Sequence, residues 1–371
     1  MDFELSDEQA MLRDTVREVL TRTYDVETLR RVTDTDRGWS DDVWKALAEI
    51  GILGLVFTEE DGGVGGGPEE LTAVLTEFGA ALAPEPFLDS VVVPGLLVAR
   101  TADEQVRAEV LGGLAAGERL LAFAHQEKHD RWPAAAVAVS ADGSSISGTK
   151  SLVPHGDCAD TFVVSARDAD GTVGLYLVAA DADGVTRTGY RTHDRRRGAQ
   201  VVFDGAAAQR LGSGDATPLI TEIETLAQVG LCAEALGAMS RSLEMTTEYL
   251  RSRKQFGVPL ATFQALTHRA ADMYVQLELA RSLTLFGTAA LSEGRTDPLI
   301  ASRAKLQTCR SARWIGQEAI QMHGGIGMTA EYPIAHYVSR LTAISHTLGD
   351  ADAHLDAITA QVQDWEMVTV E

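Results

Sequence analysis

The chain has few cysteines and no long apolar run. Its three cysteines lie far apart, at Cys158, Cys232 and Cys309, which excludes a disulfide framework and a cysteine-rich zinc site. No apolar run is long enough to span a bilayer, and the opening stretch "MDFELSDEQAMLRD" lacks the basic and apolar parts of a signal peptide. We therefore expect a cytoplasmic protein with no membrane insertion.

Positive charge is also scarce. The 371 residues include 32 Lys and Arg but 54 Asp and Glu, which gives a net charge of -22. A nucleic-acid-binding protein needs a basic face, and none is apparent. The one dense basic stretch, "RTHDRRRG" at residues 191–198, is interpreted either as a solvated loop or as a segment that binds an anion. The composition is otherwise typical of a folded protein with two or three packed subdomains.

Residues 1–118 are predicted to form an all-helical N-terminal domain. Ser6 and Gln9 make a capping box ahead of apolar residues at helical spacing. A second helix starts after Ser40 and ends near Gly51. The five glycines of "EEDGGVGGGPEEL" do not match a dinucleotide-binding fingerprint, because no strand-turn-helix unit surrounds them. They indicate a loop before a helix that begins near Pro68.

The remaining chain divides into a β-rich part and a helical part. Residues 119–212 hold short β-rich runs separated by Gly, Asp and Ser turns, with no helix between them, which predicts an antiparallel barrel or sandwich. Residues 213–371 hold long helical patterns with seam-like apolar stripes, which predict an antiparallel four-helix bundle. The fold class expected is α+β, with a helical domain, a β domain and a helical bundle in that order.

Two motifs in the last part point to a ligand. In "RSRKQFGVPLATFQ", from Arg251 to Gln264, cations end a long helix beside an aromatic residue. They suit a helix C-terminus, but an arginine next to a ring can also bind a phosphate while the ring packs on a planar group. In "QMHGGIGMTAEYP", from Gln321 to Pro333, three glycines exceed what a helix stop requires and would let the backbone approach a pyrophosphate.

Together these motifs resemble the C-terminal signatures of the acyl-CoA dehydrogenases, and the order of helical and β parts resembles that fold over the whole chain. The resemblance implies FAD, an acyl-CoA thioester as substrate, an electron-transfer flavoprotein as electron acceptor, and a homodimer or homotetramer. It also implies cofactor-binding residues that reach the FAD of the neighbouring subunit across an interface. These are Arg253, Phe256, Gln264, Gln321, Gly324 and Gly325.

The sequence departs from the family where the base is expected. In the α,β-desaturation that the family performs, a carboxylate removes the α-proton of the thioester while the flavin takes the β-hydride. Counting from Pro333 without a gap, the family's base position is occupied by Leu348. The family's second base site, a Glu-Arg pair on the long helix, corresponds to Ala227 and Gln228. Neither position can take a proton.

The middle domain departs as well, and substitutes for the base are few. The family's loop of flavin donors appears as "AFAHQEKHDRWP", and its Trp-x-Thr stretch ends here in Pro154, which lacks an N–H and a hydroxyl. The chain's own flavin pocket therefore looks degenerate. Two carboxylates are candidate catalytic residues. Asp350 lies two residues after Leu348, and Glu234 lies on the long helix, where burial is expected to raise its pKa unless it pairs with an arginine.

A closer resemblance accounts for these losses. Several stretches, including "CAEALGAM" and "LGDADAHL", resemble the small subunit of pimeloyl-CoA dehydrogenase and similar actinobacterial heteromeric enzymes. That resemblance implies an α2β2 heterotetramer in which a larger acyl-CoA dehydrogenase paralogue carries the base and the intact flavin loop. Two alternatives stay open. One is a self-sufficient homomeric enzyme with Asp350 or Glu234 as the base, and the other is a non-redox acyl-CoA-binding or scaffold protein.

Overall fold

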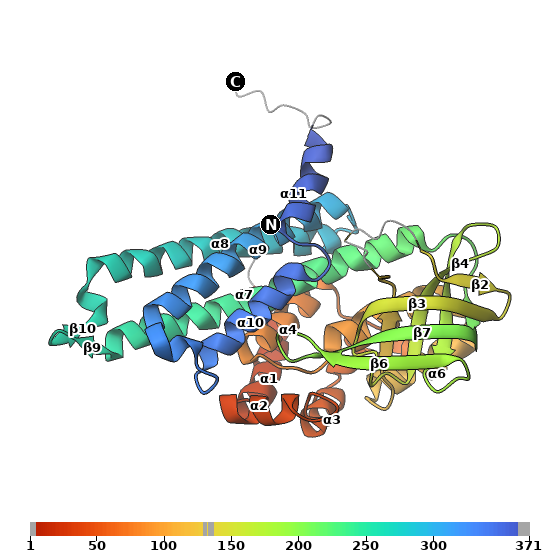
Figure 1. Ribbon diagram of the computed structural model, residues 1–371, viewed down its shortest axis with the longest axis horizontal. Helices are drawn as coiled ribbons and strands as arrows, with labels where there is room; N and C mark the ends of the chain where they lie inside the picture. Colours follow the sequence, from red (N-terminus) through yellow and green to blue (C-terminus); the bar gives the residue numbers. More distant parts are fainter. Residues whose placement is uncertain (1–4, 129–131, 133–136, 363–371) are drawn as a thin grey trace.

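The computed structural model describes residues 5–128, 132 and 137–362, and its first part is helical, as expected (Figure 1). The elements are α1 Asp7–Thr23, α2 Val26–Thr33, α3 Asp41–Glu49, α4 Pro68–Ala81, a π-helical segment Phe87–Val92, α5 Val93–Thr101 and α6 Glu104–Ala115. The predicted signals are confirmed: Ser6 and Gln9 form the capping box of α1, and Ser40 caps α3. Pro68 opens α4 directly after the glycine loop.

An eight-stranded sheet follows the helices, and most of its neighbouring strands are antiparallel. The strands are β1 Leu121–Ala124, β2 Ser140–Asp142, β3 Ser145–Pro154, β4 Thr161–Arg167, β5 Val173–Ala179, β6 Val185–Arg191, β7 Arg197–Ala207 and β8 Gln209–Leu211. Among the strands that the structure describes, the pairings of β4 with β1 and β2 are parallel and the others are antiparallel. The middle residues of strand β4, 162–166, are buried on both faces of the strand, and most of them are apolar. Phe162 and Val164 face the core of the sheet, and Val163 packs with the helices.

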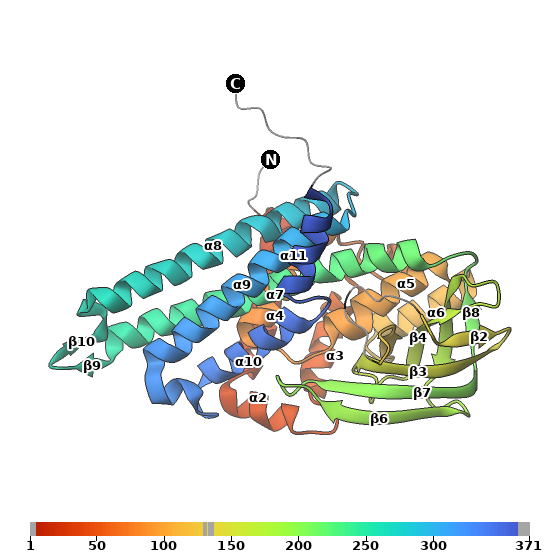
Figure 2. The ribbon, with the colours of Figure 1, turned by 45° about the horizontal axis from the view of Figure 1, so that its top comes forward.

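The last part forms a bundle of long helices that extends away from the sheet (Figures 1 and 2). Its helices are α7 Thr217–Ser252, α8 Gln264–Ser292, α9 Pro298–His323, α10 Pro333–His346 and α11 Ala351–Ala360. The short strands β9 Lys254–Gln255 and β10 Val258–Pro259 form a hairpin between α7 and α8. The predicted stripe of α8 is confirmed where Met273, Leu277 and Ala280 are buried. The segment after Pro333 is two helices, because the backbone turns at Leu348 and Gly349.

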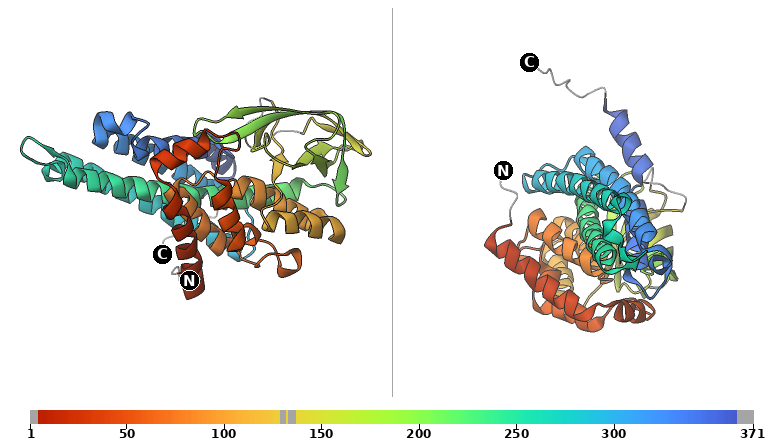
Figure 3. Two further views of the ribbon diagram at one scale, coloured as in Figure 1. Left: turned by 90° about the horizontal axis from the view of Figure 1, so that it is seen from below. Right: turned by 90° about the vertical axis from the view of Figure 1, so that its left-hand side faces the viewer.

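The N-terminal helices lie along one side of the bundle, where α4 crosses α7 (Figure 3). Glycines allow the two backbones to touch. A Cβ on Gly79 would lie 1.8 Å from the Glu234 carbonyl oxygen, and a Cβ on Gly237 would lie 1.9 Å from that of Thr76. No real Cβ contact is so short, so both positions require glycine. This crossing fixes the N-terminal helices against α7, the helix that precedes the RKQFG motif.

Together these elements confirm the predicted α+β fold. The basic stretch at residues 191–198 is partly exposed, and four of its arginines pair with carboxylates. Arg191 and Arg195 pair with Asp34, Arg196 with Glu234, and Arg197 with Asp157. Arg191, Arg195 and Arg196 therefore join the middle domain to its neighbours, and Arg197 pairs within it. Within the described residues, no helix is long and apolar enough to cross a membrane, and the three cysteines are free.

Candidate functional site

The six predicted cofactor-binding residues lie at the end of the bundle farthest from the sheet, around the β9–β10 hairpin and the last turn of α9 (Figure 1). Arg253 caps the end of α7 and Phe256 is in the hairpin turn, while Gln264 begins α8. Gln321 lies in the last turn of α9, and Gly324 and Gly325 follow that helix. All six are exposed, and the ring of Phe256 is 92% exposed. A Cβ on Gly324 or Gly325 would meet nothing within 4 Å. Among the described residues, Arg253 has no ion-pair partner. These side chains and glycines present an open surface, and the ring of Phe256 contacts only the edge of Phe263 among the described aromatic rings.

The hairpin holds Phe256 in an unfavourable backbone conformation. Phe256 has φ 54° and Gly257 has φ 84°, as in the two-residue turns that favour Asn-Gly. A side chain other than glycine in this left-handed region costs about 1–2 kcal/mol. Gly324 is also in a region that favours glycine, with φ 66° and ψ -142°. Strain at an almost fully exposed phenylalanine indicates a functional position.

An aromatic cluster joins the hairpin end of α7 to the glycine turn. Tyr249, one turn before the end of α7, stacks on His323 at 4.6 Å between ring centroids. Tyr332 packs against both rings, at 6.5 Å from Tyr249 and 5.1 Å from His323. The His323 imidazole is buried, and its Nδ1 lies 2.8 Å from the Ala319 carbonyl oxygen. The two motifs of the sequence are therefore one structural unit.

The family's base position lies in a well-anchored turn between α10 and α11. Leu348 has φ 51°, and its carbonyl oxygen is 3.0 Å from His354 Nε2 and 3.5 Å from Gln228 Nε2. The fully buried Lys305 donates to the carbonyl oxygens of Ile344, at 2.7 Å, and Gly349, at 3.1 Å. The turn is thus rigid, but the side chain at its centre has no proton-accepting group.

Side chains of this chain fill the space beside that turn. The indole of Trp132 packs on His354 with ring centroids 4.3 Å apart, and a Cβ on Gly349 would lie 2.7 Å from the indole. Trp132 Nε1 lies 3.3 Å from Glu224 Oε2 on α7. A flavin ring in this cleft would have to displace the indole, and Pro154 at the end of β3 offers it no donor. The indole of Trp132 therefore occupies the space next to the turn that carries Leu348 and Gly349.

Of the two possibilities for Glu234, a pKa raised by burial or a pairing with arginine, the structure shows the pairing. Glu234 is 2% exposed, and its two oxygens accept from Arg340 at 2.8 and 2.6 Å and from Arg196 at 2.8 Å. Burial alone would raise its pKa, but the two arginines hold the pKa below its usual range. Asp194 joins the network by accepting from Arg340 at 2.8 Å. A carboxylate held in this way is a weak base, and its ion pairs with the two arginines are structural.

Asp350 lies at the N-terminus of α11, where its carboxylate accepts the Ala353 N–H at 2.9 Å. It is exposed. This is the geometry of a helix cap. The sequence reasoning missed a third carboxyl, Glu224, which burial leaves with a pKa raised to about 7. In the sequence, Glu224 could have been noticed only because it lies one helical turn before Gln228, at the family's second base site.

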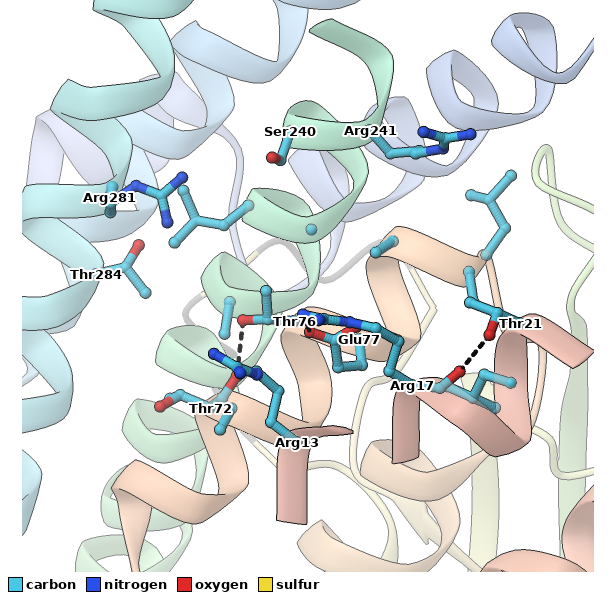
Figure 4. Close-up of a pocket in the computed structure, with 18 of the residues that line it drawn as sticks. Arg13, Arg17, Thr21, Thr72, Thr76, Glu77, Ser240, Arg241, Arg281 and Thr284 are labelled. Atoms are coloured by element: carbon cyan, nitrogen blue, oxygen red, sulfur yellow. Dashed lines mark hydrogen bonds and ion pairs between the residues drawn. The ribbon is translucent and has the colours of Figure 1, made fainter. Parts of the chain in front are cut away.

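A groove of about 1140 Å³ lies between α1, α4, α7 and α8 (Figure 4). Ser240 and Glu244 of α7 line this groove. At helical spacing these residues point to a different side of α7 from Gln228, so the groove lies on another face of the helix. Its rim carries four arginines, but carboxylates neutralise them. The pairs are Arg13 with Asp14, Arg17 with Glu77, Arg241 with Glu244 and Arg281 with Glu278. The arginines at the rim therefore give the groove no excess of positive charge that would attract an anion.

The chain is similar to known proteins over its full length. Family models described as "Acyl-CoA dehydrogenase, N-terminal domain" and "Acyl-CoA dehydrogenase, C-terminal domain" match residues 6–118 and 221–363. The relative "Acyl-CoA dehydrogenase IpdE2" of Mycobacterium tuberculosis is 30% identical, over 97% of this chain and 98% of that protein.

Two solved structures share the fold closely. The "Tcur3481-Tcur3483 steroid ACAD" variant is 32% identical with a TM-score of 0.87, and covers 96% of this chain and 98% of its own. The ChsE4-ChsE5 complex from Mycobacterium tuberculosis is 26% identical with a TM-score of 0.91, over 99% of this chain and 100% of its own. The chain therefore belongs to the acyl-CoA dehydrogenase family of FAD-dependent oxidoreductases.

Proposed function

We propose that the chain is the small subunit of a heteromeric acyl-CoA dehydrogenase, as in the pimeloyl-CoA dehydrogenase type, and completes the FAD site of a larger paralogous subunit. The observation that carries this proposal is the contrast between two sites. The six cofactor-binding residues are exposed and have an open surface, while the chain's own cleft is filled by Trp132 and has Leu348 at the base position. A homodimer would direct the hairpin of one copy toward the filled cleft of the other.

Each exposed residue has a chemical role in this proposal. Arg253 binds the FAD pyrophosphate, since a guanidinium forms paired hydrogen bonds with phosphate oxygens. Gly324 and Gly325 let backbone N–H groups approach the same anion. Phe256 packs against a planar part of the cofactor, and the amides of Gln264 and Gln321 orient it. When bound, FAD supplies the acceptor for the β-hydride of an acyl-CoA thioester.

The larger subunit supplies the carboxylate that removes the α-proton, and an electron-transfer flavoprotein takes the electrons onward. Two similar structures favour a heteromer, because each is named for two proteins, ChsE4-ChsE5 and Tcur3481-Tcur3483. The self-sufficient alternative has less support, because Glu234 is ion-paired and Asp350 caps a helix. A non-redox acyl-CoA-binding protein would remain colourless in every assembly.

The test is the visible spectrum of the chain, alone and co-purified with a larger paralogue. We expect a colourless chain alone and a yellow complex with about one FAD per pair of subunits. Arg253→Ala is expected to remove FAD from the complex, whereas Arg251→Ala, an exposed arginine two residues earlier, is the matched control. A yellow chain that an acyl-CoA bleaches without a partner would refute the heteromer. Unchanged flavin content in Arg253→Ala would refute the role of the hairpin.

A further inference from the structure

An apolar stripe on the outer face of α8 is exposed. Val275 is 53% exposed, Leu279 is 47% exposed and Phe286 is 39% exposed. Together with the exposed Ser282, these residues are spaced by four, three and four positions, which is the spacing of a seam between two packed helices. The buried residues of α8 already pack against the rest of the bundle. The stripe is therefore a second apolar face of the same helix.

The stripe continues onto α9. Ser311 Oγ donates to the Gln276 carbonyl oxygen at 2.8 Å, and Arg269, farther back on α8, pairs with Glu318, farther along α9. The two helices are therefore antiparallel here. Trp314 is three residues after Ser311 and four before Glu318, so it lies in line with both contacts to α8. Its indole is 46% exposed and extends the apolar stripe.

Charged side chains of both signs border the stripe. Asp272 on α8 and Arg310 and Arg313 on α9 are exposed, and none of them forms an ion pair with another residue in the described part of the chain. A face that carries both signs can meet the same face of another copy, because each charge then has an opposite charge to approach. The two arginines also reduce the repulsion between chains that each carry a net charge of -22.

The order of side chains along the stripe makes it complementary to itself. In an antiparallel contact about a two-fold axis between Leu279 and Ser282, Leu279 of one copy lies opposite Ser282 of the other. In the same register, Val275 of one copy lies opposite Phe286 of the other. Each pair joins a larger side chain to a smaller one, which lets the two helices interdigitate. A second copy of this chain therefore fits the stripe.

We propose that the α8 stripe, together with Trp314, is the surface through which two copies of this chain associate. Its exposed Trp and Phe and the neighbouring arginines are residue types enriched at the centres of protein interfaces. The contact runs along the side of α8, whereas the β9–β10 hairpin precedes that helix. In the heteromer, and here the inference rests on the proposed function, the contact joins two pairs of subunits through their small subunits and does not use the hairpin.

The mass of the chain alone, measured by light scattering at micromolar concentration, tests the contact. We expect a dimer for the wild type and a monomer for Leu279→Asp, which puts a carboxylate into the apolar contact twice. The dissociation constant should rise at least about a hundredfold, because each of the two substitutions costs at least about tenfold. Met11→Asp is the matched control at a residue of α1 that is 64% exposed and outside the stripe, and it should remain a dimer.

A second variant and the complex with a larger paralogue complete the test. Val275→Asp should also be a monomer, and it replaces Leu279→Asp if that variant does not fold. In the complex, Leu279→Asp should halve the mass and leave the FAD content per pair of subunits unchanged. A monomeric wild-type chain, or variants of Leu279 and Val275 that remain dimers, would overturn the proposal. A dimer that forms no FAD-containing complex would instead refute the proposed function.

Discussion

Replacing Phe256 by asparagine separates the cofactor role of the hairpin from its stability. Asparagine tolerates the left-handed conformation of Phe256, φ 54°, so the substitution relieves about 1–2 kcal/mol of backbone strain. The ring is 92% exposed, and the packing it loses is an edge contact with Phe263 at 6.2 Å. An aromatic pair of this kind contributes about 0.5–1.5 kcal/mol. The two effects nearly cancel, and the free energy of unfolding should change by less than about 1 kcal/mol.

The FAD content of the complex should nevertheless fall, because the exposed ring is lost. Urea unfolding of the chain and the flavin absorbance of the purified complex measure the two effects. Phe256→Ala is the control, since alanine keeps the strain and also loses the ring; it should destabilise the chain by about 0.5–1.5 kcal/mol. Destabilisation of Phe256→Asn by more than about 2 kcal/mol, or unchanged flavin content, would refute the argument that strain is retained here for the cofactor.

Three further predictions concern the interior. Glu234→Gln leaves Arg340 partly unpaired in a buried site and should cost about 3–5 kcal/mol in urea unfolding, while the exposed Glu244→Gln should cost under about 1. Gly237→Ala should lower stability by about 1–3 kcal/mol or more by pushing α4 from α7; Gly112→Ala, whose Cβ meets nothing within 4 Å, should not destabilise. Burial would raise the pKa of Asp194, but Arg340 and Arg196 lower it to about 2, so Asp194→Asn should reduce the loss of stability between about pH 4 and 2.

The sequence was sufficient for the features that depend on neighbouring residues. Ser6 with Gln9, Ser40 and Pro68 marked helix starts because caps act within one turn. The stripe of α8 was visible because helical periodicity places its apolar residues on one face. The two C-terminal motifs located the exposed hairpin and the glycine turn for the same reason. The turn residues themselves create the conformations seen at Phe256 and Gly324.

The tertiary structure alone decided the charge states of the interior carboxyl groups. The partners of Glu234 are 38 and 106 residues away in sequence, at Arg196 and Arg340, so no local pattern indicates whether its pKa rises or falls. Glu224 had no motif at all, and its raised pKa comes from its burial on α7. A pKa is set by lost hydration and by charges that folding brings together. The sequence by itself determined where the elements and motifs lie, and only the packing of distant segments determined which carboxyl groups are paired.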